Sequence, residues 1–133
     1  MSEEKKIKVV LLEPGKLART AEIGTSIEDL QNAVDGLIEP FYPFEEQVCI
    51  VCNDEGMING MLPNRSVKNK DGVMVDFIFG PAFICDCRGE SFDSLSDEQI
   101  ARYTKMFRYP EHLARLNGKL IGIPFNPQRE HER

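Results

Sequence analysis

The sequence predicts an α+β domain built on a mainly antiparallel sheet, with two to three helices packed on one face. Short apolar runs bounded by turn residues recur along the chain, which is typical of strands. Two segments instead repeat apolar residues at helical spacing behind a capping residue. Most of the expected strands are joined by short turns, which connect antiparallel neighbours.

The first half of the chain predicts two strands, a helix and two further strands. Ser26 is placed to cap the helix, whose buried face carries Leu30 and Val34, and Gly36 is placed to end it. Pro40 restricts the strand that follows to a sheet edge or to an irregular extended segment. The expected strands are residues 7–13, 17–23, 37–44 and 47–53.

The second half predicts a long strand pair, or one bent strand, over residues 73–87, after a polar loop at 63–72. Ser96 and Gln99 form a capping box that begins a helix. Pro110 stops this helix and is placed to start a short one through Leu116, before a last strand at residues 120–124.

Length and composition fit a single packed domain. The chain has 133 residues, of which 41% are hydrophobic. We place the domain at residues 1–125 and a polar tail at 126–133. No apolar leader follows the N-terminus, and no run approaches the roughly 20 apolar residues that span a bilayer. We therefore expect a cytoplasmic protein without membrane contact.

Charge is distributed unevenly along the chain. Residues 20–64 hold nine acids and no Lys or Arg, whereas residues 102–119 hold five bases and one acid. The simplest interpretation is two solvated faces of opposite sign. The alternatives are a basic partner for the acidic segment, an acidic partner for the helical segment, or mimicry of DNA by the acids. The net charge of −6 argues against nucleic acid as a partner.

Four cysteines, at positions 49, 52, 85 and 87, raise the question of a metal site. Cys49 and Cys52 lie on an expected strand, where residues three apart point to opposite faces and cannot chelate one ion. The Cys-x-x-Cys pair does not open a helix, as a redox pair of the thioredoxin type does. We expect reduced, buried thiols and no metal.

The chemistry-bearing residues that we single out follow the strand at 47–53. Successive turns between strands are expected to gather amides, carboxylates and a guanidinium at one end of the sheet, as a pocket for a small polar ligand or a peptide terminus. The alternative is that the Asn residues only stabilise the turns in which they lie and bind no ligand. The candidate binding residues are Asn53, Glu55, Asn59, Asn64 and Arg65, with Asp76 nearby.

Catalytic machinery is not evident in the sequence. There is no Gly-rich phosphate loop, and the two histidines are His112, near an expected helix start, and His131, in the tail. We therefore expect no cofactor and no catalytic residue. A hydrolase or transferase using the carboxylates of Glu55 and Asp76 remains the enzymatic alternative. Glu39 lies in an apolar stretch, and Arg65 is a reasonable partner for it.

Four segments, at residues 7–15, 30–44, 52–65 and 76–85, resemble the family described as domain of unknown function 3846. The most specific is the run from Asn53 to Arg65. Two features depart from the family pattern: Pro81 after Gly80, and the cysteines at 85 and 87. The resemblance implies a small domain of bacteria, phages and mobile elements, and it brings no activity with it. We therefore expect a non-enzymatic binding or interaction module for a protein or a small polar ligand. The sequence does not indicate an oligomeric state.

Overall fold

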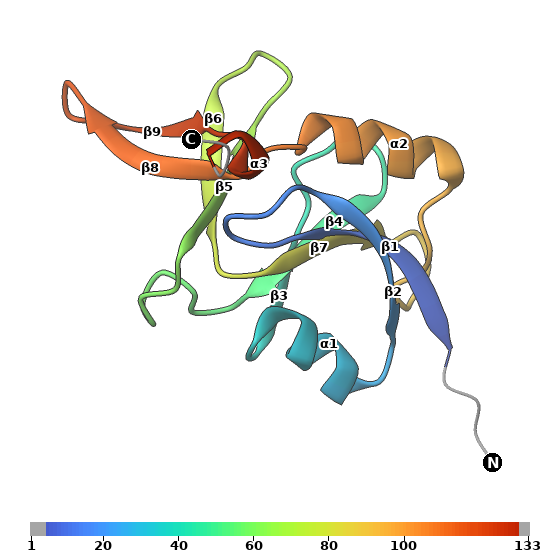
Figure 1. Ribbon diagram of the computed structural model, residues 1–133. Helices are drawn as coiled ribbons and strands as arrows, with labels where there is room; N and C mark the ends of the chain where they lie inside the picture. Colours follow the sequence, from blue (N-terminus) through green and yellow to red (C-terminus); the bar gives the residue numbers. More distant parts are fainter. Residues whose placement is uncertain (1–4, 131–133) are drawn as a thin grey trace.

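A five-stranded antiparallel sheet lies at the centre of the protein in the computed structural model, which describes residues 5–130 (Figure 1). Its strands are ordered β2-β1-β7-β4-β3, and all neighbours run antiparallel. The predicted α+β class with a mainly antiparallel sheet is confirmed. The five strands are β1 (Lys6–Leu12), β2 (Arg19–Gly24), β3 (Ile38–Phe41), β4 (Val48–Asn53) and β7 (Ala82–Asp86).

Two helices cover this sheet, one on each face (Figure 1). Helix α1 (Ile27–Val34) buries Leu30 and Val34 on one face, and α2 (Asp97–Met106) buries Tyr103 on the other. The expectation that the helices share one face is therefore wrong. The physical reason lies in the central strands. All of β7 and nearly all of β4 is buried, so their apolar side chains need a helix on each face of the sheet.

Two separate hairpins complete the fold: β5 (Pro63–Lys68) with β6 (Met74–Phe79), and β8 (Glu111–Leu116) with β9 (Lys119–Pro124). The β8–β9 hairpin lies beside β5–β6 in Figure 1. A Glu111 carboxylate oxygen joins them by accepting from the backbone N–H of Ser66 at 3.0 Å and from its hydroxyl at 2.7 Å.

Both hairpins correct an expectation drawn from the sequence. The expected loop at 63–72 contains strand β5, which is polar because its side chains form hydrogen bonds inside the protein. The helix expected to begin at Pro110 is strand β8. Asn117 and Gly118 both adopt positive φ, 52° and 81°, which is the conformation of a two-residue hairpin turn.

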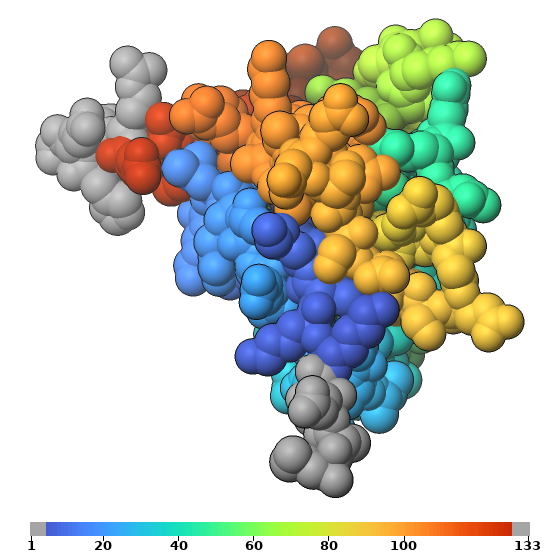
Figure 2. Space-filling view, turned by 90° about the vertical axis from the view of Figure 1, so that its right-hand side faces the viewer, coloured from blue at the N-terminus to red at the C-terminus, as the bar shows by residue number. Residues whose placement is uncertain are grey.

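Helix α2 packs beside the hairpin of β1 and β2. Figure 2 shows α2, in orange, lying over the blue strands of the N-terminal hairpin. Part of the expected tail forms the short helix α3 (Pro127–Glu130), and residues 131–133, with His131, lie outside the described residues. Within residues 5–130, no helix has the length and apolar character needed to cross a bilayer.

Candidate functional site

The six candidate residues occupy three different environments. Asn53 closes the C-terminal end of α1, where its Nδ2 donates to the carbonyls of Val34 and Asp35 at 3.0 and 3.1 Å. Its Oδ1 accepts from the backbone N–H of Glu55 at 2.8 Å. Since both ends of this buried amide have partners in the protein, Asn53 fastens α1 to the end of β4.

Asn64 and Arg65 form a second, fully buried environment. Asn64 donates to the carbonyls of Leu12 and Gly80, and its Oδ1 accepts from Arg65. The guanidinium also donates to four backbone carbonyls, those of Glu13, Lys16, Phe107 and Arg108. Burial lowers the pKa of Arg65 to about 10, with the charges of Glu111 and Glu13 opposing the shift, so the group stays protonated at neutral pH. The partner we expected, Glu39, is not among its hydrogen-bond partners.

Glu55, Asn59 and Asp76 are exposed, the first two on the turn after β4 and the third on β6. Two of the six candidates, Asn53 and Asp76, line the same cavity. Glu55 is not among the residues that line it, so the two carboxylates of the enzymatic alternative do not share that cavity.

This cavity, about 670 Å³, runs along strand β6, all six of whose residues line it. We call it the β6 groove. Strands β3 and β4 form one side, and the β8–β9 hairpin forms the other. The turn after β4 closes one end, because Gly56 approaches the carbonyl oxygen of Phe79 too closely to leave room for a Cβ.

The β3–β4 side of the groove is acidic. Glu39, Asp54 and Asp76 line it around the half-buried thiol of Cys52, whose Sγ lies 3.5 Å from the backbone carbonyl of Glu39. Burial, and then the negative charges of Glu39, Asp76 and Asp54, raise the pKa of this thiol to about 12. The three carboxylates therefore concentrate negative charge in the region of the groove around Cys52.

The hairpin side is apolar and open to solvent. Val75 on β6 is 55% exposed and Leu120 on β9 is 44% exposed, and Leu113 lies beside them. Arg115 is the one base among the described residues that line the groove. The sequence analysis missed this side because it predicted a helix over residues 111–116. In the strand that forms instead, alternate side chains share a face, and this places Leu113 and Arg115 together.

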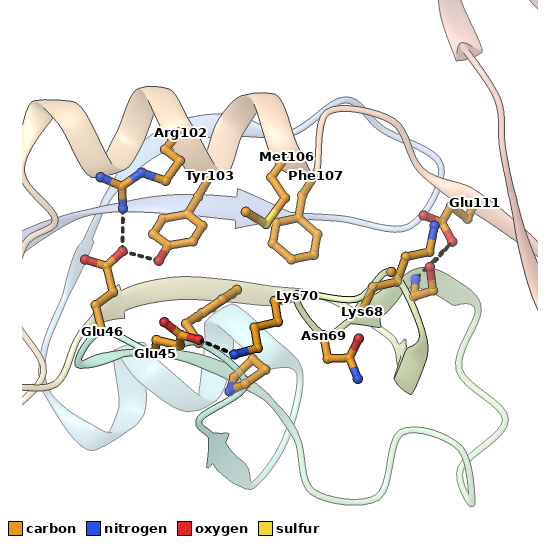
Figure 3. A pocket seen from close by; sticks show the side chains of 14 residues that line it. Glu45, Glu46, Lys68, Asn69, Lys70, Arg102, Tyr103, Met106, Phe107 and Glu111 are labelled. Carbon is orange, nitrogen blue, oxygen red and sulfur yellow. Dashed lines mark hydrogen bonds and ion pairs between the residues drawn. The ribbon is translucent and has the colours of Figure 1, made fainter.

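A second cavity, about 770 Å³, lies between α2, the segment before β4 and the β5–β6 turn (Figure 3). Most of its charged groups already have partners: Glu46 accepts from Gln99, Arg102 and Tyr103, and Glu45 pairs with Lys70 at 3.5 Å. The Tyr103 hydroxyl, more than any other contact, lowers the pKa of Glu46. The acidic segment thus meets the basic one here, and the contact holds α2 in place.

The four cysteines are free thiols. Cys49 and Cys85 lie opposite each other on β4 and β7, with their sulfur atoms 3.8 Å apart in the core. Among the residues that the structure describes, no three His, Cys, Asp or Glu side chains are arranged to hold a metal ion.

Comparison with known proteins connects the chain to one family. No curated protein and no solved structure gives a significant match. The family profile matches residues 7–108, which include the central sheet, α1, α2 and the β5–β6 hairpin but not β8–β9. The chain belongs to the family described as domain of unknown function (DUF3846).

Proposed function

We propose that the protein is a non-enzymatic binding module whose β6 groove takes a short segment of another protein carrying basic and apolar side chains. The observation that carries this proposal is the pairing of a carboxylate-lined side with an exposed apolar side in one cavity. The family resemblance supports a setting in a bacterium, a phage or a mobile element, and we propose that the protein acts in the cytoplasm.

Charge supports a basic partner. Among the described residues of the lining, Glu39, Asp54 and Asp76 carry negative charge and Arg115 alone carries positive charge, so the net charge of these residues is negative. A positively charged segment is therefore attracted to it, and a negatively charged one is repelled.

Size and polarity support a short segment. A cavity of about 670 Å³ falls in the range of sites for small ligands and is too small for a folded domain. Val75, Met57 and Leu120 leave apolar surface exposed around it, and burying such surface against apolar side chains stabilises a complex.

Fluorescence anisotropy with two labelled octapeptides tests this function. Both are capped at their ends; one repeats the dipeptide Lys-Val and the other repeats the dipeptide Glu-Val. We expect the Lys peptide to bind more tightly, with an affinity that falls as salt is added, because solvent-exposed charges are screened. Equal affinity for the two peptides, or no binding of either, would contradict the proposal.

A matched set of variants locates the binding. The triple variant Glu39→Gln, Asp54→Asn, Asp76→Asn removes the acids of the groove and should weaken the Lys peptide about tenfold, since each exposed charge contributes a few tenths of a kcal/mol or more. The control triple Glu22→Gln, Asp71→Asn, Glu90→Gln removes the same charge from positions that do not line the groove. It should bind almost as the wild type does.

A further inference from the structure

We propose that the bound segment adds a strand to the free edge of β6, and that the segment alternates basic residues with β-branched or other apolar ones. This inference rests on the proposed function and specifies the geometry of the complex.

The outer edge of β6 is unpaired. Within the part of the chain that the structure describes, β6 forms a ladder with β5 alone. Six consecutive residues of β6 line the groove. Their side chains point alternately to the two faces of the hairpin, so the groove reaches both faces around the outer edge of the strand. An edge of this kind is a template for another strand.

One backbone group marks the free edge directly. The N–H of Phe77 donates to Oδ1 of Asp76 at 2.8 Å, a side chain of its own strand, and so it does not serve the ladder with β5. The Asp76 carboxylate takes the position that the carbonyl of an incoming strand occupies. When a strand docks, this carboxylate is released and becomes available to a basic side chain.

The two faces of β6 have different surroundings. Asp76 lies opposite Val67, and Ile78 joins Val67 in the core beneath, so these residues face the main sheet with its acidic groove side. Phe77 faces the other way, toward Gly122 of β9, and its ring lies 5.4 Å from that of Phe79. A strand beside β6 therefore sends alternate side chains to an acidic and to an apolar environment.

Two peptides that have the same amino-acid composition but a different sequence test this geometry. The octapeptide of repeated Lys-Val units has the required alternation. A block octapeptide, in which all the lysines precede all the valines, has the same charge and apolar content without it. We expect the alternating peptide to bind about tenfold more tightly. If both bind equally and both lose affinity in the triple acid variant, strand addition is wrong while the proposed function stands. If neither binds, the proposed function itself fails.

Backbone methylation gives a second, independent readout. An antiparallel or parallel neighbour uses the N–H groups of alternate residues only. Two alternating peptides are therefore made, one N-methylated on the Lys residues and the other on the Val residues. We expect one of the two to lose binding about tenfold and the other to retain it, because only one set of N–H groups donates to β6; tenfold corresponds to about 1.4 kcal/mol. Retention of binding by both would overturn the proposal.

Two further measurements, one on the free protein and one on the complex, test which molecule binds along the edge of β6. We expect a monomer in sedimentation, and slower hydrogen exchange at the Phe77 amide when the alternating peptide is bound. A dimer that dissociates on the Val75→Lys substitution would assign the edge to a second copy of this chain and overturn the proposed occupant. An unchanged Phe77 exchange rate in a saturated complex would overturn the strand geometry.

Discussion

The Nε of Arg65 donates a 2.6 Å hydrogen bond to the backbone carbonyl of Phe107, and this bond fastens β5 to the C-terminal end of α2. The same guanidinium holds the carbonyls of Glu13 and Lys16, in the turn between β1 and β2. One buried cation thus joins three segments that are far apart in the chain, because its planar fork offers five donors.

Replacing Arg65 with Lys should lower the free energy of unfolding by about 3 kcal/mol. Lys keeps the charge but has three donors on one atom, so buried carbonyls are left without a partner, each at a cost of about 1–3 kcal/mol. Urea denaturation followed by circular dichroism measures the change. Arg19→Lys, at an exposed ion pair with Glu13, is the control and should change stability by less than about 0.5 kcal/mol. Equal effects of the two substitutions would refute the structural role of Arg65.

Glu46 should make the stability of the protein depend on pH in the acid range. Its folded pKa lies below the ordinary value of 4.5, chiefly because Tyr103 donates to it. The carboxylate therefore stabilises the fold above pH 4.5, and this contribution is lost as the pH falls through the folded pKa. Wild type should be more stable than Glu46→Gln at about pH 7, and this advantage should shrink as the pH falls below 4.5.

Thermal melts over a series of pH values from about 7 downwards measure this difference. The adjacent Glu45 is the matched control, because its side chain is 83% exposed and pairs with exposed Lys70. Glu45→Gln should follow the wild-type pH profile. The role assigned to Glu46 is wrong if the two glutamine variants have the same profile.

Asn53→Ala should destabilise the protein by about 2 kcal/mol, because it leaves the last carbonyls of α1 without their side-chain donor. The midpoint of urea unfolding reports the change. Asn59→Ala, on the exposed turn that follows, is expected to have little effect. A larger loss at position 59 than at position 53 would show that the cap is not what stabilises this region.

The half-buried thiols should react slowly in the folded protein. Burial raises the pKa of Cys87 to about 11, and burial with three nearby carboxylates raises the pKa of Cys52 to about 12. Since the thiolate is the nucleophile, alkylation by iodoacetamide at about pH 8 should be at least about a hundredfold slower than in urea. Peptide mass spectrometry follows each site separately. Rapid labelling of Cys52 in the native protein would contradict its placement among the acids.

The central sheet could be predicted from the sequence because its strands are apolar runs separated by turn residues. Strand β5 could not, since Asn64, Arg65 and Ser66 look like loop residues until their buried hydrogen bonds are known. The β8–β9 hairpin was missed for a different reason. Pro110 favours a helix start, although the Asn117-Gly118 turn indicates a hairpin at least as strongly.

The candidate site was predictable only in part. Asp76 and Asn53 do line the groove, but their neighbours there come from β3 and from the C-terminal hairpin, and the sequence gives no measure of that proximity. Asn64 and Arg65 have side chains that are common in binding pockets, but here they are buried and form hydrogen bonds within the protein. A polar residue beside a turn therefore does not by itself distinguish a ligand contact from a structural one.

The family match ends at residue 108, between the two walls of the β6 groove. Its acidic side belongs to the matched residues, whereas Leu113 and Leu120 of its apolar side lie on β8–β9, beyond them. In the proposed complex, the acids that attract basic residues thus lie in the matched part of the chain, and part of the surface that receives apolar residues lies outside it. Exchanging the C-terminal hairpin would change part of the apolar surface that a bound segment meets and would leave the acids of the groove in place.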